Sequence, residues 1–207
     1  MENVLTEDKM SKILDYSYDK AVNGLGNFET AEEIGRKYIE KYGDVEKAIN
    51  KLIDYQKMKC ATSGFLTGVG GAITLPVAIP ANITSVVYVQ TRMIATIASM
   101  RGYNLNDDQV KTIVFVSLTG RAAGDILKQA GIKIGMKAAE NAIKKKIPGE
   151  VLKAINKKVG FRLVTKFGQK GVINLGKCIP AVGGIIGGGA DFVGTDIIAR
   201  TAKKNFI

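Results

Sequence analysis

The first 60 positions of the chain alternate apolar and polar residues with the period of amphipathic helices. In residues 5–22 apolar side chains recur every three or four positions, with Lys and Asp between them, which predicts a first helix. Thr30, followed three residues later by Glu33, forms a capping-box pattern, so a second helix should begin there and stop at Gly43. Asp44 is then placed to cap a third helix.

The pattern changes after residue 60, because residues 62–99 carry a single charged side chain, Arg92. Pro76 and Pro80 interrupt this apolar stretch, since the residue before a proline is biased away from helical backbone. Two apolar helices separated by a break are therefore expected. Their predicted ranges are 59–73 and 81–101, with Gly102 ending the second.

Helical spacing continues to the end of the chain. Asn106 is the predicted N-cap of a helix that reaches Leu118, and Pro148 is placed at a helix start. No run of strand-like alternation occurs, so the sequence predicts an all-α fold, a multi-helix bundle with glycine-rich, closely packed helical hairpins. The remaining predicted helices are 121–145, 148–158 and 161–178, and 181–206 is expected to form two half-helices or one helix weakened by glycine.

Glycine is unusually frequent, with 24 residues, and several glycines lie four positions apart. Positions i and i+4 share one helix face, where glycine lets another backbone approach closely. The pattern is typical of a glycine zipper that enters a bilayer, and it equally fits a tightly packed core away from lipid. Prolines or charges interrupt every apolar block of about 20 residues, so no clean membrane span is predicted. The pairs are Gly64/Gly68, Gly120/Gly124, Gly131/Gly135, Gly183/Gly187 and Gly184/Gly188.

A charge inside an apolar helix is tolerated when it is paired within the bundle. The acidic residues of the C-terminal Gly-rich block are Asp191 and Asp196. We therefore predict a buried polar cluster of Gln90, Arg92, Asp191 and Asp196, in which Arg92 pairs with one of the two aspartates. Two alternatives stay open: Arg92 extends its charge to solvent, or the cluster forms a small catalytic or ligand pocket.

The net charge of +11 is concentrated in residues 101–180, which contain 16 basic and 5 acidic side chains. A basic segment can bind anionic lipid or nucleic-acid phosphates, or it can be only a solvated helix face. Few aromatic residues accompany these cations and no nucleic-acid-binding module is recognised, so anionic membrane lipid is the favoured partner and nucleic acid is not expected. The predicted docking residues are Lys144, Lys145, Lys146, Lys153, Lys157, Lys158, Arg162 and Lys166.

The chain contains no histidine, which excludes His-based catalytic triads and His metal ligands. Cys60 and Cys178 are too few for a disulfide framework or a usual structural zinc site, so we expect free thiols in an intracellular protein. Asp107 and Asp108 could bind a metal, although their place at a helix start favours capping. No catalytic residue, cofactor or metal is predicted.

Two separated blocks of the sequence resemble the EcsC protein family. The first is an LP-x-x-x-P turn followed by a Tyr-x-Gln-x-Arg-Met helix, and the second is the pattern Pro-x-x-Gly-x-x-x-Gly-Gly-x-x-Asp. The resemblance covers about 45–207 and leaves 1–44 as an N-terminal helical extension. It implies a bacterial, membrane-associated protein and supplies no catalytic residues. The matching positions are Leu75, Pro76, Pro80, Tyr88, Gln90, Arg92 and Met93, then Pro180, Gly183, Gly187, Gly188 and Asp191.

The predicted function is a non-enzymatic accessory or regulatory protein of EcsC type, located on the inner face of the cytoplasmic membrane. It would dock on anionic lipid through the basic face and the glycine-rich apolar helices. Two other functions stay open. One is a toxin-system component, either a pore-forming effector or its immunity protein, with a toxin or a membrane protein as partner. The other is a lipid-binding or lipid-acting protein with a pocket near Arg92. The oligomeric state is left open.

Overall fold

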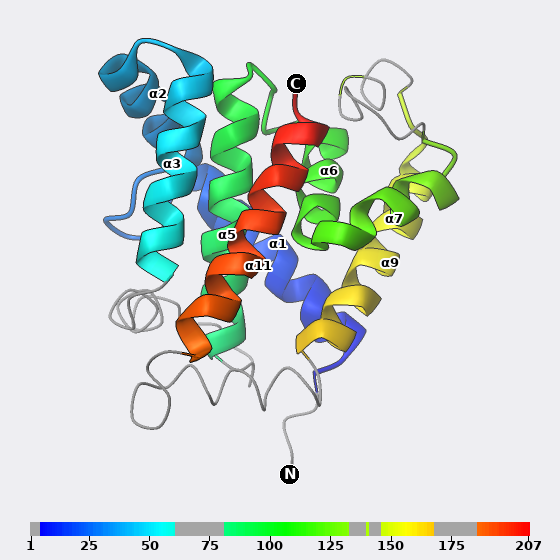
Figure 1. Cartoon of the computed structure of the whole chain (residues 1–207). Helices are drawn as coiled ribbons and strands as arrows, with labels where there is room; N and C mark the ends of the chain where they lie inside the picture. The colour runs from blue at the N-terminus through cyan, green and yellow to red at the C-terminus, as the bar shows by residue number, and fades with distance from the viewer. Residues whose placement is uncertain (1–4, 61–80, 133–139, 141–145, 168–185) are drawn as a thin grey trace.

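The computed structural model describes residues 5–60, 81–132, 140, 146–167 and 186–207, and most of these residues are helical (Figure 1). No strand occurs within these ranges. The predicted all-α fold is confirmed. The helices are α1 (Glu7–Asn23), α2 (Ala31–Tyr42), α3 (Val45–Cys60), α5 (Ala81–Met100), α6 (Asp108–Leu118), η1 (Gly120–Ala122), α7 (Ala123–Gln129), α9 (Gly149–Phe167) and α11 (Ile186–Asn205).

Helix α5 occupies the centre of the bundle, with α1, α2, α3, α6 and α11 packed against it (Figure 1). Most of its side chains between Ile83 and Met100 are buried. A helix that is apolar on nearly every side is stable only when other helices cover it. The low charge of this part of the sequence therefore reflects its central position in the core.

The helix ends predicted near the N-terminus are confirmed. The side chain of Thr30 accepts a hydrogen bond from the backbone N–H of Glu33, and the Glu33 carboxylate accepts one from the backbone N–H of Thr30. Helix α2 stops before Gly43, and the Asp44 carboxylate accepts a bond from the Lys47 backbone at 2.7 Å. Each cap satisfies backbone groups that the helix leaves unpaired, which fixes where the chain turns.

The start of α6 differs by one residue from the prediction. Its N-cap is Asp107, whose carboxylate accepts a hydrogen bond from the backbone N–H of Gln109 at 2.7 Å. Asn106, the predicted cap, lies one residue earlier. A carboxylate at this position also interacts favourably with the positive end of the helix dipole, which favours Asp107 over the neutral amide.

The long helix predicted for 121–145 is shorter in the structure. Helix α7 ends at Gln129, and Gly131 has a φ of +71°, a left-handed conformation that ends helices. Residues 133–139 and 141–145 lie outside the described ranges. The opposite error occurs in α9, which runs unbroken from Gly149 to Phe167 where two helices were predicted.

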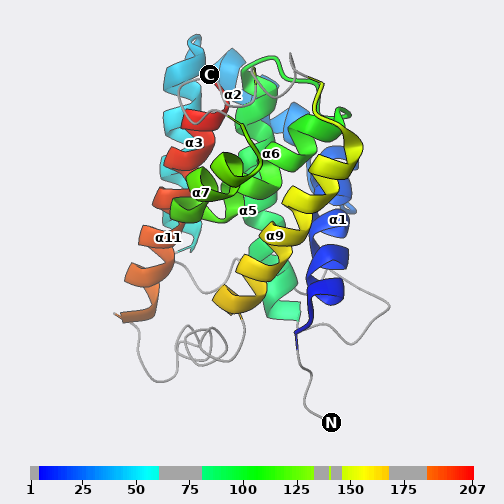
Figure 2. The ribbon, with the colours of Figure 1, turned by 90° about the vertical axis from the view of Figure 1, so that its right-hand side faces the viewer.

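Packing against α1 at Gly160 explains why α9 continues through this glycine. It is buried on the side of α9 that packs against α1, and a Cβ at this position would lie 4.0 Å from the backbone oxygen of Glu7. Figures 1 and 2 show α1 and α9 side by side. Packing against α1 offsets the cost of a glycine inside a helix, about 0.5–1 kcal/mol.

The first glycines of two predicted pairs are turn residues in the structure. Gly120 has a φ of +60° at the start of η1, and Gly131 has a φ of +71° beyond the end of α7. A Cβ at Gly120 would lie 3.1 Å from the Ile197 side chain of α11, which makes this glycine a close contact between a turn and a helix. Gly64, Gly68, Gly135, Gly183 and Gly184 lie outside the described residues.

The C-terminal element is one helix over its described part, α11, which contains Gly187, Gly188 and Gly194. The predicted helix 59–73 lies mostly outside the described ranges. Within the described residues, no helix combines the length and apolar character needed to cross a membrane.

The N-terminal helices belong to the same core as the rest. Met10 and Ile13 of α1 and Ala31 of α2 are fully buried in one cluster with Ile94 and Ile97 of α5. The division of the chain at residue 44 stays a prediction, although both helices before it pack directly against α5.

Candidate functional site

Arg92 is buried on α5, with 7% of its surface exposed. Its guanidinium carbon lies 5.3 Å from the centre of the Tyr88 ring and 5.7 Å from that of Phe28, which sits in the loop between α1 and α2. Nη1 donates a long hydrogen bond of 3.5 Å to the Tyr88 hydroxyl, and Nε has no hydrogen-bond partner among the described residues. Aromatic rings thus supply the immediate surroundings of this buried charge.

Arg92 was predicted to pair with Asp191 or Asp196, and the structure pairs Asp196 with other cations. The Asp196 carboxylate binds the ammonium of Lys57 on α3 and the Nε of Arg200, the latter at 2.6 Å. These two contacts hold the pKa of Asp196 below its ordinary value, Lys57 contributing most. The side chain of Asp191 lies outside the described residues. Asp196 is paired with Lys57 of α3, whereas Arg92 contacts Phe28 in the loop after α1 and Tyr88 of its own helix.

Gln90 is not brought together with Arg92 either. It is partly exposed and does not line the pocket beside Arg92. Residues two positions apart on a helix point in nearly opposite directions. The helix α11 is held to α3 instead, by Asp196 with Lys57 and by Lys203 with Asn50 at 2.9 Å.

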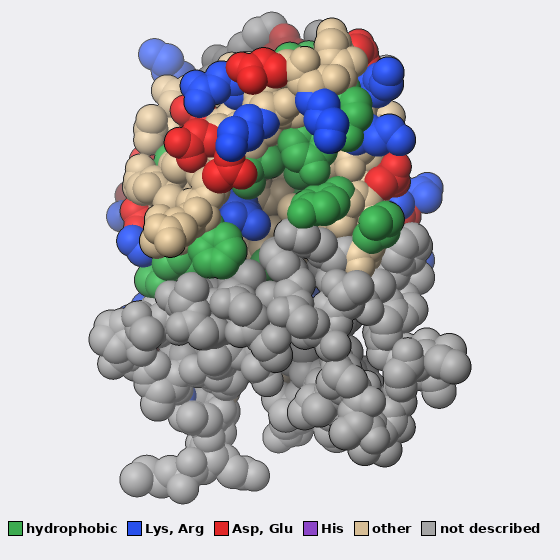
Figure 3. Space-filling view, turned by 90° about the vertical axis from the view of Figure 1, so that its left-hand side faces the viewer, with side chains coloured by type: hydrophobic (Ala, Val, Ile, Leu, Met, Phe, Trp, Pro, Cys, Tyr) green, Lys and Arg blue, Asp and Glu red, His purple; other side chains and the backbone are tan. Residues whose placement is uncertain are grey.

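A pocket of about 280 Å³ lies beside Arg92, between α2, α3, α5 and the loop after α1. Gln56 of α3 enters it with 4% of its surface exposed, and its Oε1 has no hydrogen-bond partner among the described residues. The pocket is also lined by Asn27, Phe28, Glu29, Ile34, Tyr38, Leu52 and Tyr55. Figure 3 shows this side of the molecule, with charged side chains toward one end and hydrophobic ones below them.

No carboxylate in the described part of the chain pairs with Arg92. The Glu29 carboxylate is engaged by the ammonium of Lys37. Burial raises the pKa of Tyr88, against the opposing effect of Arg92, and burial also raises the pKa of Tyr38. Both phenols are therefore neutral near pH 7 and can donate hydrogen bonds.

The predicted docking residues that the structure describes lie mainly on α9. Lys153, Lys157, Lys158, Arg162 and Lys166 are all exposed, while Leu152, Ile155, Val159 and Leu163 are buried on the opposite side of the helix. Lys146 is exposed ahead of the helix. Lys144 and Lys145 lie outside the described residues.

Phe161, which the sequence analysis did not single out, is 57% exposed among these cations. It borders a groove of about 470 Å³ between α9 and α7, together with Lys157, Lys158 and Arg162 of α9 and Ile126 of α7. Which positions of a helix are buried depends on the elements that pack against it. The helical pattern in the sequence therefore does not predict whether Phe161 is buried or exposed.

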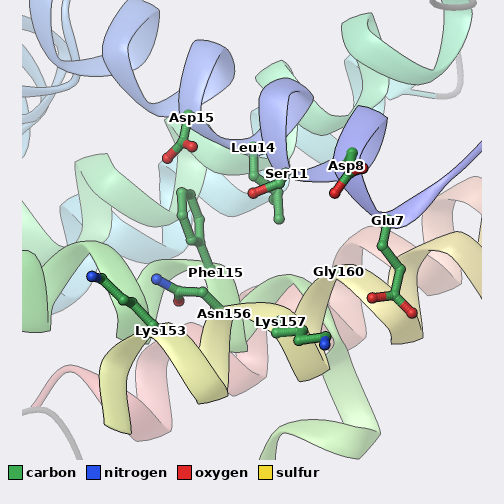
Figure 4. Close-up of a pocket in the computed structure, with 10 residues that line it drawn as sticks. All are labelled: Glu7, Asp8, Ser11, Leu14, Asp15, Phe115, Lys153, Asn156, Lys157 and Gly160. Carbon is green, nitrogen blue, oxygen red and sulfur yellow. The ribbon is translucent and has the colours of Figure 1, made fainter. Parts of the chain in front are cut away.

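The other side of α9 has a different character. A pocket of about 500 Å³ separates it from α1, and Figure 4 shows Lys153, Asn156 and Lys157 of α9 on one wall with Glu7, Asp8 and Asp15 of α1 on the other. Acidic side chains here face the lysines and weaken the local positive potential. Glu7 and Asp125 also border the groove on the α7 side. Three cations outnumber them there, Lys157, Lys158 and Arg162, so the basic surface is strongest on that side, around Phe161.

The chain matches the model of the EcsC protein family over residues 3–206, a range that includes residues 3–44, which the sequence motifs had left out. No curated protein and no solved structure matches the chain.

Proposed function

Because the chain belongs to the EcsC protein family, we propose that it is a non-enzymatic accessory protein that docks on anionic membrane lipid through the α7 side of α9. The observation that carries this proposal is the exposed Phe161 ring beside Lys157, Lys158 and Arg162. An aromatic ring flanked by cations suits a membrane interface, where the ring enters the headgroup region and the cations meet lipid phosphates.

The expected binding energy is moderate. Each cation near an anionic membrane surface contributes about 1 kcal/mol. Burial of an aromatic side chain adds at most about 1.5–3 kcal/mol, reduced here because Phe161 is already partly covered. Such a surface gives reversible, salt-sensitive binding. The anionic leaflet that it suits is the inner face of the cytoplasmic membrane.

Vesicle flotation tests this proposal. The purified chain should float with vesicles that contain anionic lipid and stay behind with neutral vesicles, and high salt should release it. The double variant Lys158→Glu/Arg162→Glu should bind roughly 30-fold more weakly or worse, since two favourable contacts of about 1 kcal/mol each are lost and two repulsions are added.

The matched control is Lys47→Glu/Lys51→Glu, the same change of charge at exposed positions on α3. It should bind as the unaltered protein does. If both variants lose the same amount of vesicle binding, the cause is the net charge of the protein and not the surface of α9. Binding that survives high salt would contradict peripheral docking. Release of a trapped dye from the vesicles would favour the pore-forming alternative.

A further inference from the structure

We propose that the pocket beside Arg92 binds a phosphate group, carried by a small soluble molecule or by a lipid headgroup, with the guanidinium of Arg92 as its counter-charge. The pocket lies between α2, α3 and α5, on the other side of the bundle from α9 in Figure 1. The proposal is therefore independent of membrane docking by α9.

The first argument is the cost of an unpaired buried charge. Arginine keeps its positive charge in proteins, and a buried cation is stable only when other groups neutralise or hydrogen-bond it. The Phe28 and Tyr88 rings provide part of this stabilisation through cation–π contacts. The Tyr88 hydroxyl accepts a single long hydrogen bond of 3.5 Å from Nη1, and Nε has no partner among the described residues.

The second argument is that no described carboxylate meets Arg92. Glu29, the acidic residue that lines the pocket, is paired with Lys37, and Asp196 is paired with Lys57 and Arg200. An anion from outside the chain would supply the missing negative charge. Arginine suits this role because its planar fork of N–H donors matches two oxygens of a phosphate.

Gln56 is an independent third observation. It belongs to a different helix, it is nine-tenths buried, and its Oε1 has no hydrogen-bond partner among the described residues although the side chain lines the same pocket. A side-chain amide can present either its oxygen or its NH₂ group to a ligand. Two buried polar groups of this kind in one pocket are typical of a binding site.

The remaining polar groups favour phosphate over a simple carboxylate. Asn27, Tyr38 and Tyr55 add donor groups to those of Arg92 and Gln56, and a phosphate has more oxygens to accept from them. The volume of about 280 Å³ is at the small end of ligand pockets. It suits a headgroup or a small phosphorylated molecule, with any acyl chains remaining outside.

Isothermal titration of the full chain with monomeric ligands tests the proposal and separates the two sources. The ligands are inorganic phosphate, glycerol 3-phosphate and dihexanoyl phosphatidic acid below its micelle concentration, all at constant ionic strength set with chloride. We expect binding of at least one ligand at millimolar concentration or below. Tighter binding of the lipid identifies a headgroup site, and similar affinities identify a site for soluble phosphates.

Three variants connect binding to this pocket. Arg92→Gln should weaken affinity roughly tenfold or more because it removes the charge-assisted bonds. Tyr38→Phe removes a single hydroxyl and should weaken it by about twofold to tenfold. Arg121→Gln deletes an exposed positive charge elsewhere and should leave affinity unchanged.

The proposal is overturned if none of the three ligands binds, or if Arg92→Gln binds as well as the unaltered chain. If circular dichroism shows that Arg92→Gln does not fold, the variants Tyr38→Phe and Gln56→Leu test the site instead. Unchanged ligand affinity in both of them overturns the proposal. The α9 variant Lys158→Glu/Arg162→Glu should keep its affinity for these soluble ligands, so failure of membrane docking and failure of this pocket give different results.

Discussion

Arg92 and the cations of α9 show two ways of placing positive charge on one helical bundle. Arg92 is enclosed by aromatic rings and is 7% exposed, whereas Lys158 and Arg162 stand in solvent. Water solvates an exposed cation at little cost, but a buried one must be compensated by its surroundings. A single buried arginine is therefore more informative about a ligand than a row of exposed lysines.

The same contrast shows that the net charge of the chain does not by itself identify a binding partner. The chain carries a formal charge of +11, yet the lysines of α9 on the α1 side lie across a pocket from Glu7, Asp8 and Asp15. Only the α7 side of α9 combines cations with an exposed aromatic ring. The position of each charge relative to its neighbours decides its partner, and that position follows from packing.

The largest expected effect concerns the two faces of α9. Leu163 is buried in the core cluster, so Leu163→Ala should lower the free energy of unfolding by about 2–5 kcal/mol through lost contacts and a cavity. Phe161→Ala, two residues away on the exposed face, should change it by less than about 0.5 kcal/mol. Urea denaturation of both variants measures this difference. Equal losses would show that Phe161 is held by the fold and is not available to lipid.

A smaller effect of opposite sign is expected at Arg92. In phosphate-free buffer Arg92→Leu should raise the free energy of unfolding by about 1–3 kcal/mol, because an apolar side chain replaces a buried charge that the described residues compensate only in part. Added phosphate should stabilise the unaltered chain and leave the variant unchanged. Urea denaturation with and without phosphate measures both changes.

Arg121→Leu, which removes an exposed arginine, is the control and should respond to phosphate as the unaltered chain does. A loss of about 3–5 kcal/mol in Arg92→Leu would instead indicate that a negative partner within the chain has been deprived of its cation.

Local signals in the sequence were sufficient to predict most helices near the N-terminus and the centre. Thr30 with Glu33 and Asp44 each act within three residues of their own position, so the chain needs no distant contact to use them. The break predicted at 159–160 does not occur because Gly160 packs against α1, which lies more than a hundred residues away from α9 in the chain. Gly131 was predicted to lie within a helix, whereas its φ of +71° places it beyond the end of α7.

The buried site was predicted only in part. The burial of Arg92 follows from the apolar helix around it, and Tyr88 lies one turn earlier on the same face. Phe28 and Gln56 come from distant segments, and nothing in the spacing of the sequence connects them to Arg92. Asp196 was assigned to Arg92 as one of two acidic residues in its block, whereas the facing helix offers it Lys57.

The pair between Asp196 and Lys57 gives the smallest effect and a defined dependence on pH. Asp196→Asn should lower the free energy of unfolding at pH 7 by about 1 kcal/mol, since both side chains are mostly buried, at 19% and 17% exposed. Asp54→Asn, an exposed carboxylate on the same helix as Lys57, should change it little.

The pKa of Asp196 is lower in the folded chain than its ordinary value of 3.8, so its contribution to stability is fully present well above pH 3.8 and is lost as the pH falls through the folded pKa. The difference between Asp196→Asn and the unaltered chain should therefore shrink in acid, and urea denaturation at a series of pH values measures it. A difference that stays constant in acid would mean that α11 is held to α3 by packing, with the ionised pair contributing nothing. Because α11 also packs on α5, the apolar contacts of α11 with α3 and α5 would then be what holds it in the bundle.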